Sequence, residues 1–240
     1  MINTHTPEGK NNAPNPDAHG HLDLSQFEGA IFDVDGTLLD SMCQWQNVEA
    51  NYILSLGKTP RADFKDVLRG QSQAETAIYF KEHYGVDKTD QEITDEKNNM
   101  MEKFYLGEVT LRNGVVELLE LLKAHGIKMC VATASASHLV DAGMGRLGIL
   151  KYFSRTFSCC DEDTTKSKPD IFIKAAEFLG TEIRKTIVFE DALHAVKSAK
   201  AAGFTVVAVY DDSMADLQPE INQLADYHYD CWSDFVEQYS

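Results

Sequence analysis

Two aspartates, Asp33 and Asp35, are separated by one residue and directly follow the apolar segment 30–32. Such a segment predicts a buried strand whose carboxyl end opens into a polar crevice, where ligands bind in open α/β sheets. Carboxylates at this spacing suit phosphoryl transfer, because one can attack phosphorus while the other passes a proton to and from the reacting oxygens. Gly36, the next residue, lets backbone amides approach a phosphate. The alternative is a strand that ends in an ordinary Asx-type turn, where Asp and Gly are also common.

Other polar residues follow or precede later segments. Thr133 and Ala134 come after the apolar segment 127–132, and a hydroxyl followed by backbone amides at a strand-to-helix turn predicts a phosphate cradle. A plain helix N-cap would give the same pattern. Lys166 and Lys168 lie just before a predicted helix. One of them could neutralise a phosphoryl group, and the alternative is two solvated surface cations.

A second acidic pair, Glu190 and Asp191, follows the apolar segment 187–189. Together with Asp33 and Asp35 it would form a carboxylate-rich pocket, and all-oxygen ligands of this kind suit Mg²⁺. Four carboxylates brought together without a cation would repel one another strongly. We therefore predict that a divalent ion and one lysine accompany them, with a helix cap as the alternative role for the second pair.

The segments that carry these residues alternate with helical patterns. Strands are predicted at 127–132, 156–158, 186–189 and 205–209, and helices at 115–124, 137–147, 169–179 and 192–202. Alternation at these lengths predicts βαβ units and a Rossmann-like, doubly wound parallel α/β sheet. The carboxyl ends of parallel strands lie at one edge of such a sheet, so the polar residues should share one crevice.

Between the first predicted strand and this alternating part, the pattern is helical throughout and contains no strand candidate. The predicted helices are 45–56, 62–69, 72–84 and 90–106, with a capping box at 72–75. We therefore predict a small all-helical domain inserted after the first strand. The predicted division is a flexible tail at 1–26, an α/β core at 27–41 and 110–240, and the helical domain at 42–109.

Composition limits the partners. The formal charge of −16 argues against nucleic acid or a membrane surface as a partner, because phosphates repel such a field. No apolar run reaches the roughly 20 residues that span a bilayer, and the polar N-terminus lacks the apolar core of a signal peptide. Five cysteines without a CxxC pair fit reduced thiols. We expect a cytoplasmic protein that is a monomer or a weak homodimer.

The ordered polar residues resemble the four motifs of the haloacid dehalogenase superfamily, over residues 29 to about 210. The residues that carry this resemblance are Asp33, Asp35, Gly36, Thr37, Thr133, Lys166, Glu190 and Asp191. The helical insert resembles the cap of the subgroup that includes β-phosphoglucomutase, phosphoglycolate phosphatase and many sugar phosphatases. The third motif of the family usually reads Gly-Lys-Pro-x-Pro-Asp. Aligning its end with Pro169-Asp170 makes Lys166 the family lysine, with Lys168 as the alternative.

The resemblance also implies roles for these residues. Asp33 would be the nucleophile that forms an aspartyl-phosphate, and Asp35 the general acid and base. Mg²⁺ would be held by the Asp33 carboxylate, the Asp35 backbone carbonyl and Asp191, with Glu190 close by or acting through water. The hydroxyl of Thr133 and the amide of the next residue, Ala134, would hold phosphate oxygens.

Two departures from the subgroup concern the substrate. β-Phosphoglucomutases carry a cap histidine and a cap arginine where this chain has Trp45 and Gln73. An arginine there would grip the second phosphate of a bisphosphate, so its absence favours hydrolysis. We therefore predict a Mg²⁺-dependent phosphatase for a small phosphorylated metabolite. The alternatives are a sugar-phosphate mutase and, less favoured, a non-catalytic binding module. Trp45, Arg69 and Gln73 are candidate substrate contacts. The alternatives are core packing for Trp45 and an exposed surface position for Arg69.

Overall fold

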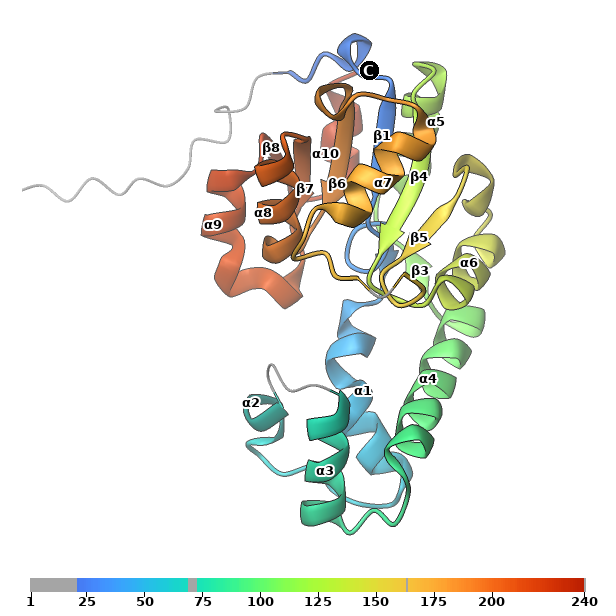
Figure 1. Ribbon diagram of the computed structural model, residues 1–240, viewed down its shortest axis with the longest axis vertical. Helices are drawn as coiled ribbons and strands as arrows, with labels where there is room; N and C mark the ends of the chain where they lie inside the picture. The colour runs from blue at the N-terminus through green and yellow to red at the C-terminus, as the bar shows by residue number, and fades with distance from the viewer. Residues whose placement is uncertain (1–20, 69–72, 163, 240) are drawn as a thin grey trace, which may run out of the picture.

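The computed structural model describes residues 21–68, 73–162 and 164–239 (Figure 1). A six-stranded parallel sheet has the strand order β5-β4-β1-β6-β7-β8. Its strands are β1 (Gly29–Phe32), β4 (Lys128–Thr133), β5 (Thr156–Ser158), β6 (Thr186–Glu190), β7 (Thr205–Val209) and β8 (Tyr227–Tyr229). Two short strands, β2 (Leu39–Asp40) and β3 (Thr110–Leu111), form an antiparallel ribbon. The predicted α/β fold is confirmed.

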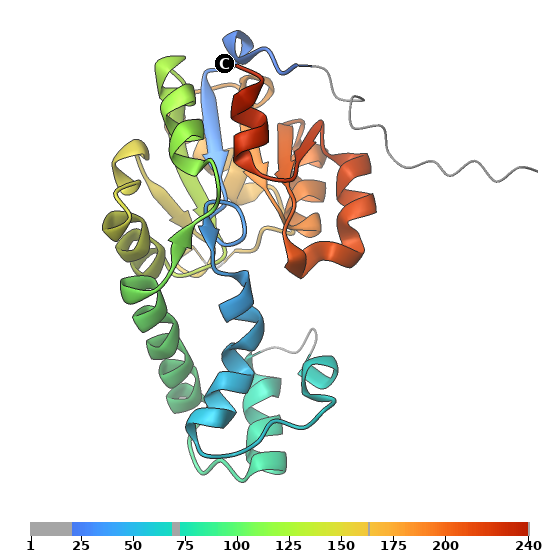
Figure 2. The ribbon, with the colours of Figure 1, turned by 180° about the vertical axis from the view of Figure 1, so that it is seen from behind.

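Successive residues of a strand point to opposite faces of the sheet, so these apolar strands present side chains on both faces. Helices cover each face and bury these side chains. On one face Phe32 and Phe189 pack in a core with α5 (Val115–Ala124), α6 (Ser137–Arg146) and α10 (Trp232–Glu237). On the other face Ile31 and Val188 pack with α7 (Asp170–Leu179), α8 (Leu193–Ala202) and α9 (Gln218–Leu224). Figure 1 shows the face of α7 and α8, and Figure 2 shows the face of α5 and α10.

Four helices lie apart from the sheet, at the bottom of Figure 1. They are α1 (Met42–Ser55), α2 (Phe64–Leu68), α3 (Gln73–Tyr84) and α4 (Asp90–Gly107). This helical block encloses its own apolar cluster, which includes Tyr52, Phe64 and Phe80. The long helix α4 extends from this block back to the sheet, where it packs against α6. The boundaries of the helical domain at 42 and 109 stay a prediction, as does the tail at 1–26, most of which lies outside the described residues.

The sequence analysis did not identify several elements. Strand β8 reads Tyr-His-Tyr, and three residues without an aliphatic side chain do not form a recognisable strand pattern. Strands β2 and β3 have only two residues each. Short 3₁₀ helices complete the described part at Leu24–Gln26, Leu150–Tyr152, Ile183–Lys185 and Asp212–Leu217. The predicted capping box at 72–75 begins outside the described residues, whereas one forms at the start of α4 from Thr89 and Glu92.

Helix α10 is tied to the loop that follows β1. The indole Nε1 of the fully buried Trp232 donates to the backbone carbonyl of Thr37 at 2.7 Å, across 195 positions of sequence. Gly114, at the start of α5, has a φ of +83°, and a Cβ there would lie 2.2 Å from the backbone nitrogen of Ser233. The close approach of α10 to both segments therefore requires glycine at this position.

Candidate active site

The predicted catalytic carboxylates meet at the point where the strand order of the sheet reverses. After β1 the chain adds β4 and β5 on one side, and it then returns to place β6 on the other side of β1. Ligand crevices of open α/β sheets lie at such a switch point, beyond the carboxyl ends of the strands. Asp33 follows β1 and donates its backbone N–H to the carbonyl of Phe189 at 3.0 Å, while Glu190 and Asp191 lie at the end of β6.

Lys166 joins two of these carboxylates. Its Nζ donates to Oδ1 of Asp33 and, at 2.6 Å, to Oε1 of Glu190, and all three side chains are buried. The backbone carbonyl of Lys166 accepts a hydrogen bond of 2.6 Å from the Ser198 hydroxyl on α8, which fixes the turn that carries the lysine. Lys168, the alternative, is exposed. Of the two lysines, the structure therefore brings Lys166 to the acidic cluster.

Burial governs the proton affinities in this cluster. Burial raises the pKa of Asp33 to about 7. The ammonium of Lys166 lowers this pKa, whereas the carboxylates of Glu190 and Asp35 raise it further. Burial, followed by the charges of Glu190 and Asp33, also raises the pKa of Asp191 well above its ordinary value. Burial alone would lower the pKa of Lys166, but the charges of Asp33 and Glu190 outweigh it and raise that pKa. The cluster therefore holds more negative charge than one lysine neutralises.

The donor set fits a divalent cation. Asp33, Glu190 and Asp191 each offer a carboxylate oxygen, and these three oxygens lie within 4.8 Å of one another. Hard cations such as Mg²⁺ prefer oxygen ligands of this kind. Oδ1 of Asp191 accepts a 3.1 Å hydrogen bond from the Thr37 hydroxyl. Glu190 is already committed, because one oxygen accepts from Lys166 and the other from the amides of residues 191 and 192 at 2.9 Å each.

Gly36 allows the loop after β1 to pass against this cluster. Its φ is +86°, and a Cβ at this position would lie 2.4 Å from Oδ2 of Asp191 and 2.9 Å from Cγ of Met42. Its backbone N–H donates to the carbonyl of Leu39 at 2.9 Å, which closes the loop. Any side chain at position 36 would therefore displace the carboxylate of Asp191.

Asp35 has very different surroundings. Its Oδ1 accepts a hydrogen bond of 2.6 Å from the Ser41 hydroxyl and another from the hydroxyl of Tyr105, and its Oδ2 accepts one of 2.5 Å from Ser135. Sequence reasoning missed all three donors. Ser41 comes six positions after Asp35, and Ser135 follows Thr133 in the same turn, so their positions offered a signal. Tyr105 offered none, because it lies 70 positions from Asp35 on a helix assigned to the insert.

The predicted phosphate loop lies beside these residues. Thr133 is fully buried at the end of β4, and its Oγ1 accepts from the backbone N–H of Ser135 at 3.0 Å. Ala134 lines a cavity of about 250 Å³, which Lys166 and His194 also line. The turn after β4 and the lysine therefore border the same space, as a phosphate cradle requires.

Three predicted substrate contacts have different outcomes. The indole Nε1 of Trp45 donates to the hydroxyl of Tyr105 at 3.0 Å, and the ring packs against the core on the α5 face of the sheet. The structure therefore links Trp45 to Asp35 through Tyr105. Arg69 lies outside the described residues. Gln73 begins α3, and its side chain is also outside the described part.

A family model of haloacid dehalogenase-like hydrolases matches residues 30–209. The chain belongs to this family. Among its relatives, protein CbbY of Rhodobacter capsulatus is 28% identical over 197 residues, which are 76% of this chain and 85% of CbbY. The fructose-1-phosphate phosphatase YqaB of Escherichia coli is 28% identical over 190 residues, which are 77% of this chain and 97% of YqaB.

A solved structure confirms the fold of this chain. The crystal structure of a putative β-phosphoglucomutase from Thermotoga maritima superposes with a TM-score of 0.74 and 23% identity, and the match covers 89% of this chain and 98% of that one. The family model confirms the family and the hydrolase class that the sequence predicts, and the solved structure confirms the fold.

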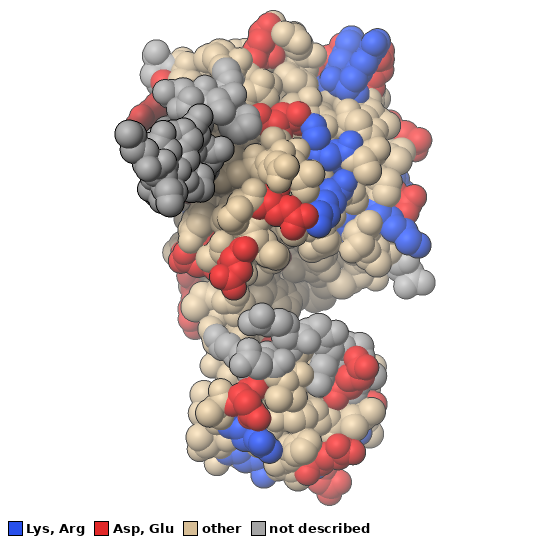
Figure 3. All heavy atoms as spheres, turned by 90° about the vertical axis from the view of Figure 1, so that its left-hand side faces the viewer, with Lys and Arg blue, Asp and Glu red and all other residues tan. Residues whose placement is uncertain are grey.

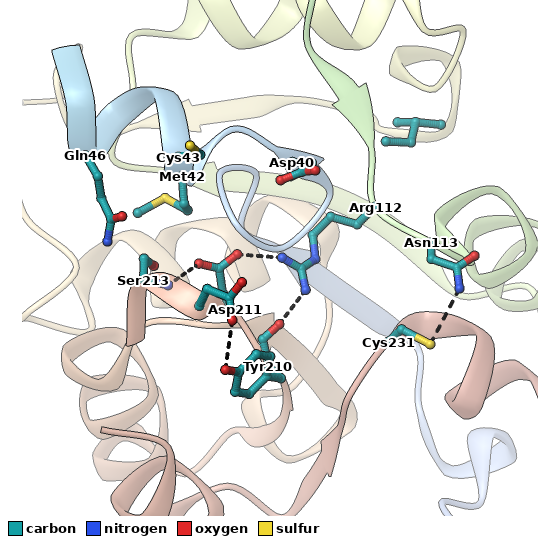
Figure 4. Close-up of a pocket in the computed structure, with 12 residues that line it drawn as sticks. Asp40, Met42, Cys43, Gln46, Arg112, Asn113, Tyr210, Asp211, Ser213 and Cys231 are labelled. Carbon is teal, nitrogen blue, oxygen red and sulfur yellow. Dashed lines mark hydrogen bonds and ion pairs between the residues drawn. The ribbon is translucent and has the colours of Figure 1, made fainter. Parts of the chain in front are cut away.

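Figure 4 shows the residues that line a second cavity of this hydrolase. This cavity measures about 450 Å³ and is bounded by the start of α1 and by the loops after β3 and β7. Its main feature is an ion pair of 2.6 Å between Arg112 and Asp211, both of which are largely buried. Met42 lines this cavity and also lies against Gly36, so the loop after β1 separates the cavity from the acidic cluster. The sequence analysis did not single out this pair.

The surface of the hydrolase shows where charges gather. In Figure 3 the helical block is joined to the rest by a narrow waist, and acidic and basic side chains are interspersed on both parts. The formal charge of −16 is therefore not concentrated in one patch on this face.

Proposed function

We propose that this hydrolase is a Mg²⁺-dependent phosphatase that acts on a small phosphorylated metabolite through an aspartyl-phosphate. The observation that carries the proposal is the pairing of Asp33 with Lys166 beside Asp35, at the switch point of the sheet. Named relatives support it, since YqaB is a fructose-1-phosphate phosphatase.

The first step is the attack of an Asp33 carboxylate oxygen on phosphorus. The P–O bond to the leaving group breaks as the new O–P bond forms, and the leaving oxygen takes a proton from the Asp35 carboxyl. Lys166 holds one Asp33 oxygen and places a positive charge where negative charge builds up on the phosphoryl group.

The second step returns Asp33 to its starting state. Asp35, now a carboxylate, takes a proton from water as the water oxygen attacks phosphorus, and the bond between phosphorus and Asp33 breaks to release inorganic phosphate. The Thr133 hydroxyl and the Ala134 amide bind the phosphoryl oxygens through both steps. The Asp33 and Asp191 carboxylates and the Asp35 carbonyl would hold the metal ion, with Glu190 positioning Lys166. When bound, Mg²⁺ neutralises charge on the phosphoryl oxygens.

We also propose a cytoplasmic protein without nucleic-acid or membrane partners, which acts as a monomer or weak homodimer. Its charge of −16 and five free cysteines support this. Among the described residues, no helix combines the length and the apolarity that a bilayer span requires.

Phosphate release from a panel of substrates tests the proposal. The panel contains sugar phosphates, phosphoglycolate, nucleotides, pyrophosphate and p-nitrophenyl phosphate, each with Mg²⁺ and with a chelator. We expect release from one class, loss of release with chelator, and a fall of about 10⁴-fold or more in the Asp33→Asn variant, because the nucleophile acts together with its partners. Conversion of a hexose 1-phosphate that requires a bisphosphate activator would instead support the mutase. Release that the Asn variant retains would contradict the assignment of the nucleophile.

A further inference from the structure

The hydroxyl of Tyr105 reaches Asp35 from a helix that begins far from the sheet. Tyr105 lies near the end of α4, is fully buried and donates to Oδ1 of Asp35. Two contacts with α6 fix its place. A Cβ at Gly143 would lie only 3.0 Å from Cδ1 of the Tyr105 ring, and the Tyr105 carbonyl accepts from Nε of Arg146 at 3.2 Å. The ring is therefore held by packing as well as by its hydroxyl.

Trp45 decides which way the Tyr105 proton points. The indole Nε1 of Trp45 donates to the Tyr105 oxygen at 3.0 Å. An indole N–H can only donate, so the Tyr105 oxygen is the acceptor in this contact. The single hydroxyl proton of Tyr105 is then available for the carboxylate of Asp35.

The two oxygens of Asp35 are held unequally. Oδ1 accepts from both Tyr105 and Ser41, whereas Oδ2 accepts from Ser135 alone. A carboxylic acid carries its proton on one oxygen, and a hydroxyl such as that of Ser135 can turn to accept as well as donate. Oδ1 faces two donors, one of which is oriented by an indole, so Oδ2 is the oxygen with freedom to carry a proton.

We propose that Tyr105, oriented by Trp45, is a positioning residue that holds Oδ1 of Asp35 and reserves Oδ2 for proton transfer to the leaving group. This inference rests on the proposed function, in which Asp35 is the general acid. Without the Tyr105 hydroxyl, Oδ1 keeps only the donor Ser41. The carboxyl group is then held less firmly and presents its proton to the leaving oxygen less often.

The dependence on the leaving group tests this role. The Tyr105→Phe variant removes only the hydroxyl, and kcat/KM is measured for the best alkyl phosphate of the panel and for p-nitrophenyl phosphate. An alkoxide needs a proton as it leaves, whereas nitrophenolate leaves without one. We expect kcat/KM for the alkyl phosphate to fall about 10-fold to 100-fold, the size expected for one hydrogen bond to a charged group, and kcat/KM for the aryl phosphate to fall by less than about twofold.

Two further variants separate positioning from general damage. Trp45→Phe should show a smaller loss with the same preference for the alkyl phosphate, and no further loss when Tyr105→Phe is already present, because Trp45 acts through Tyr105. Tyr52→Phe is the matched control. It removes a buried tyrosine hydroxyl that donates to Glu96 at 2.9 Å within the helical block, and it should leave both kcat/KM values unchanged.

Equal losses for both substrates in Tyr105→Phe, or no loss for either, would overturn the inference while the proposed function stands. An added loss from Trp45→Phe in the Tyr105→Phe background would also overturn it. A wild-type chain that releases phosphate from no substrate of the panel would instead refute the proposed function, and the inference would fall with it.

Discussion

Asp33 and Asp35 lie two residues apart on one loop, yet their surroundings differ in kind. Asp33 is buried among charges, with Lys166 as its hydrogen-bond donor and with carboxylate oxygens of Glu190 and Asp191 within 4.8 Å of one of its own. Asp35 is held by three hydroxyl groups, and no lysine or arginine of the described residues pairs with its carboxylate. The loop thus places one carboxylate in a charged cluster and the other in a polar but neutral one.

This difference matches the two tasks in phosphoryl transfer. A nucleophile gains from a fixed cation, because charge builds up beside it as it attacks phosphorus. A proton carrier must exist in both protonation states, and neutral hydroxyls can serve either state because they both donate and accept. The contrast leads to three further predictions. Each changes the charged surroundings of Asp33 and should leave the neutral surroundings of Asp35 intact.

Removing the charge of Lys166 should have the largest effect. In Lys166→Met three buried carboxylates lose their cation, so at pH 8 we expect the free energy of unfolding to fall by about 3–5 kcal/mol and turnover to fall by about 10²–10³-fold. At pH 5 the loss of stability should be smaller, because the raised pKa values of Asp33 and Asp191 let them bind protons instead. Urea unfolding at both pH values measures this.

The control for that prediction is Lys168→Met, which removes the same charge two residues away at an exposed position. It should change the free energy of unfolding by less than about 0.5 kcal/mol. A similar loss in both variants would show that Lys166 contributes no more than general surface charge.

Thr37 should affect the metal rather than the fold. Thr37→Val keeps the shape of the buried side chain but removes the hydroxyl that donates to Asp191, so we expect Mg²⁺ affinity to fall about 10-fold to 100-fold. Titration calorimetry measures the affinity directly. Thr186→Val, which removes an equally buried hydroxyl at the opposite end of β6, should leave it unchanged. An unchanged affinity in Thr37→Val would show that the Thr37 hydroxyl does not position Asp191 for the metal.

The dependence of Mg²⁺ stabilisation on pH should be the smallest effect. The pKa of Asp33, about 7, lies above its ordinary value, so the metal-free fold binds an extra proton and loses stability as pH rises from 4 to 7. Mg²⁺ binds the deprotonated carboxylates, so it should raise Tm more at pH 8 than at pH 5, by about 3 °C. In Asp33→Asn this difference should shrink, and the raised pKa of Asp191 should maintain the remainder. An equal rise in Tm at both pH values would contradict the shifted pKa.

The charged residues around Asp33 could be predicted from the sequence, whereas the hydroxyl groups around Asp35 could not. Asp33, Asp191 and Lys166 each follow or precede an apolar segment, and parallel strands bring such ends to one edge of a sheet. Tyr105 belongs to a helix whose pattern shows only which face is apolar. Nothing in that pattern reveals that the last turn of α4 returns to β1, because this depends on the packing of α4 against α6.

The edge of the sheet escaped prediction for a different reason. Strand β8 follows α9 with a pattern too short to recognise, so the last strand and helix α10 emerge only from tertiary contacts. Their absence from the prediction also hid the contact between Trp232 and Thr37.

That contact has a consequence for the timing of synthesis. The loop that carries both aspartates is fixed by the indole of Trp232, which lies 195 positions after its partner Thr37. At about 5–20 residues per second, the ribosome makes Asp33 and Asp35 roughly 10–40 s before it makes Trp232. During that interval the nascent chain contains both aspartates but lacks the partner that fixes their loop. We therefore expect the candidate site to form after translation of the sheet is complete, and the loop with both aspartates to be among the last parts of the protein to reach its final structure.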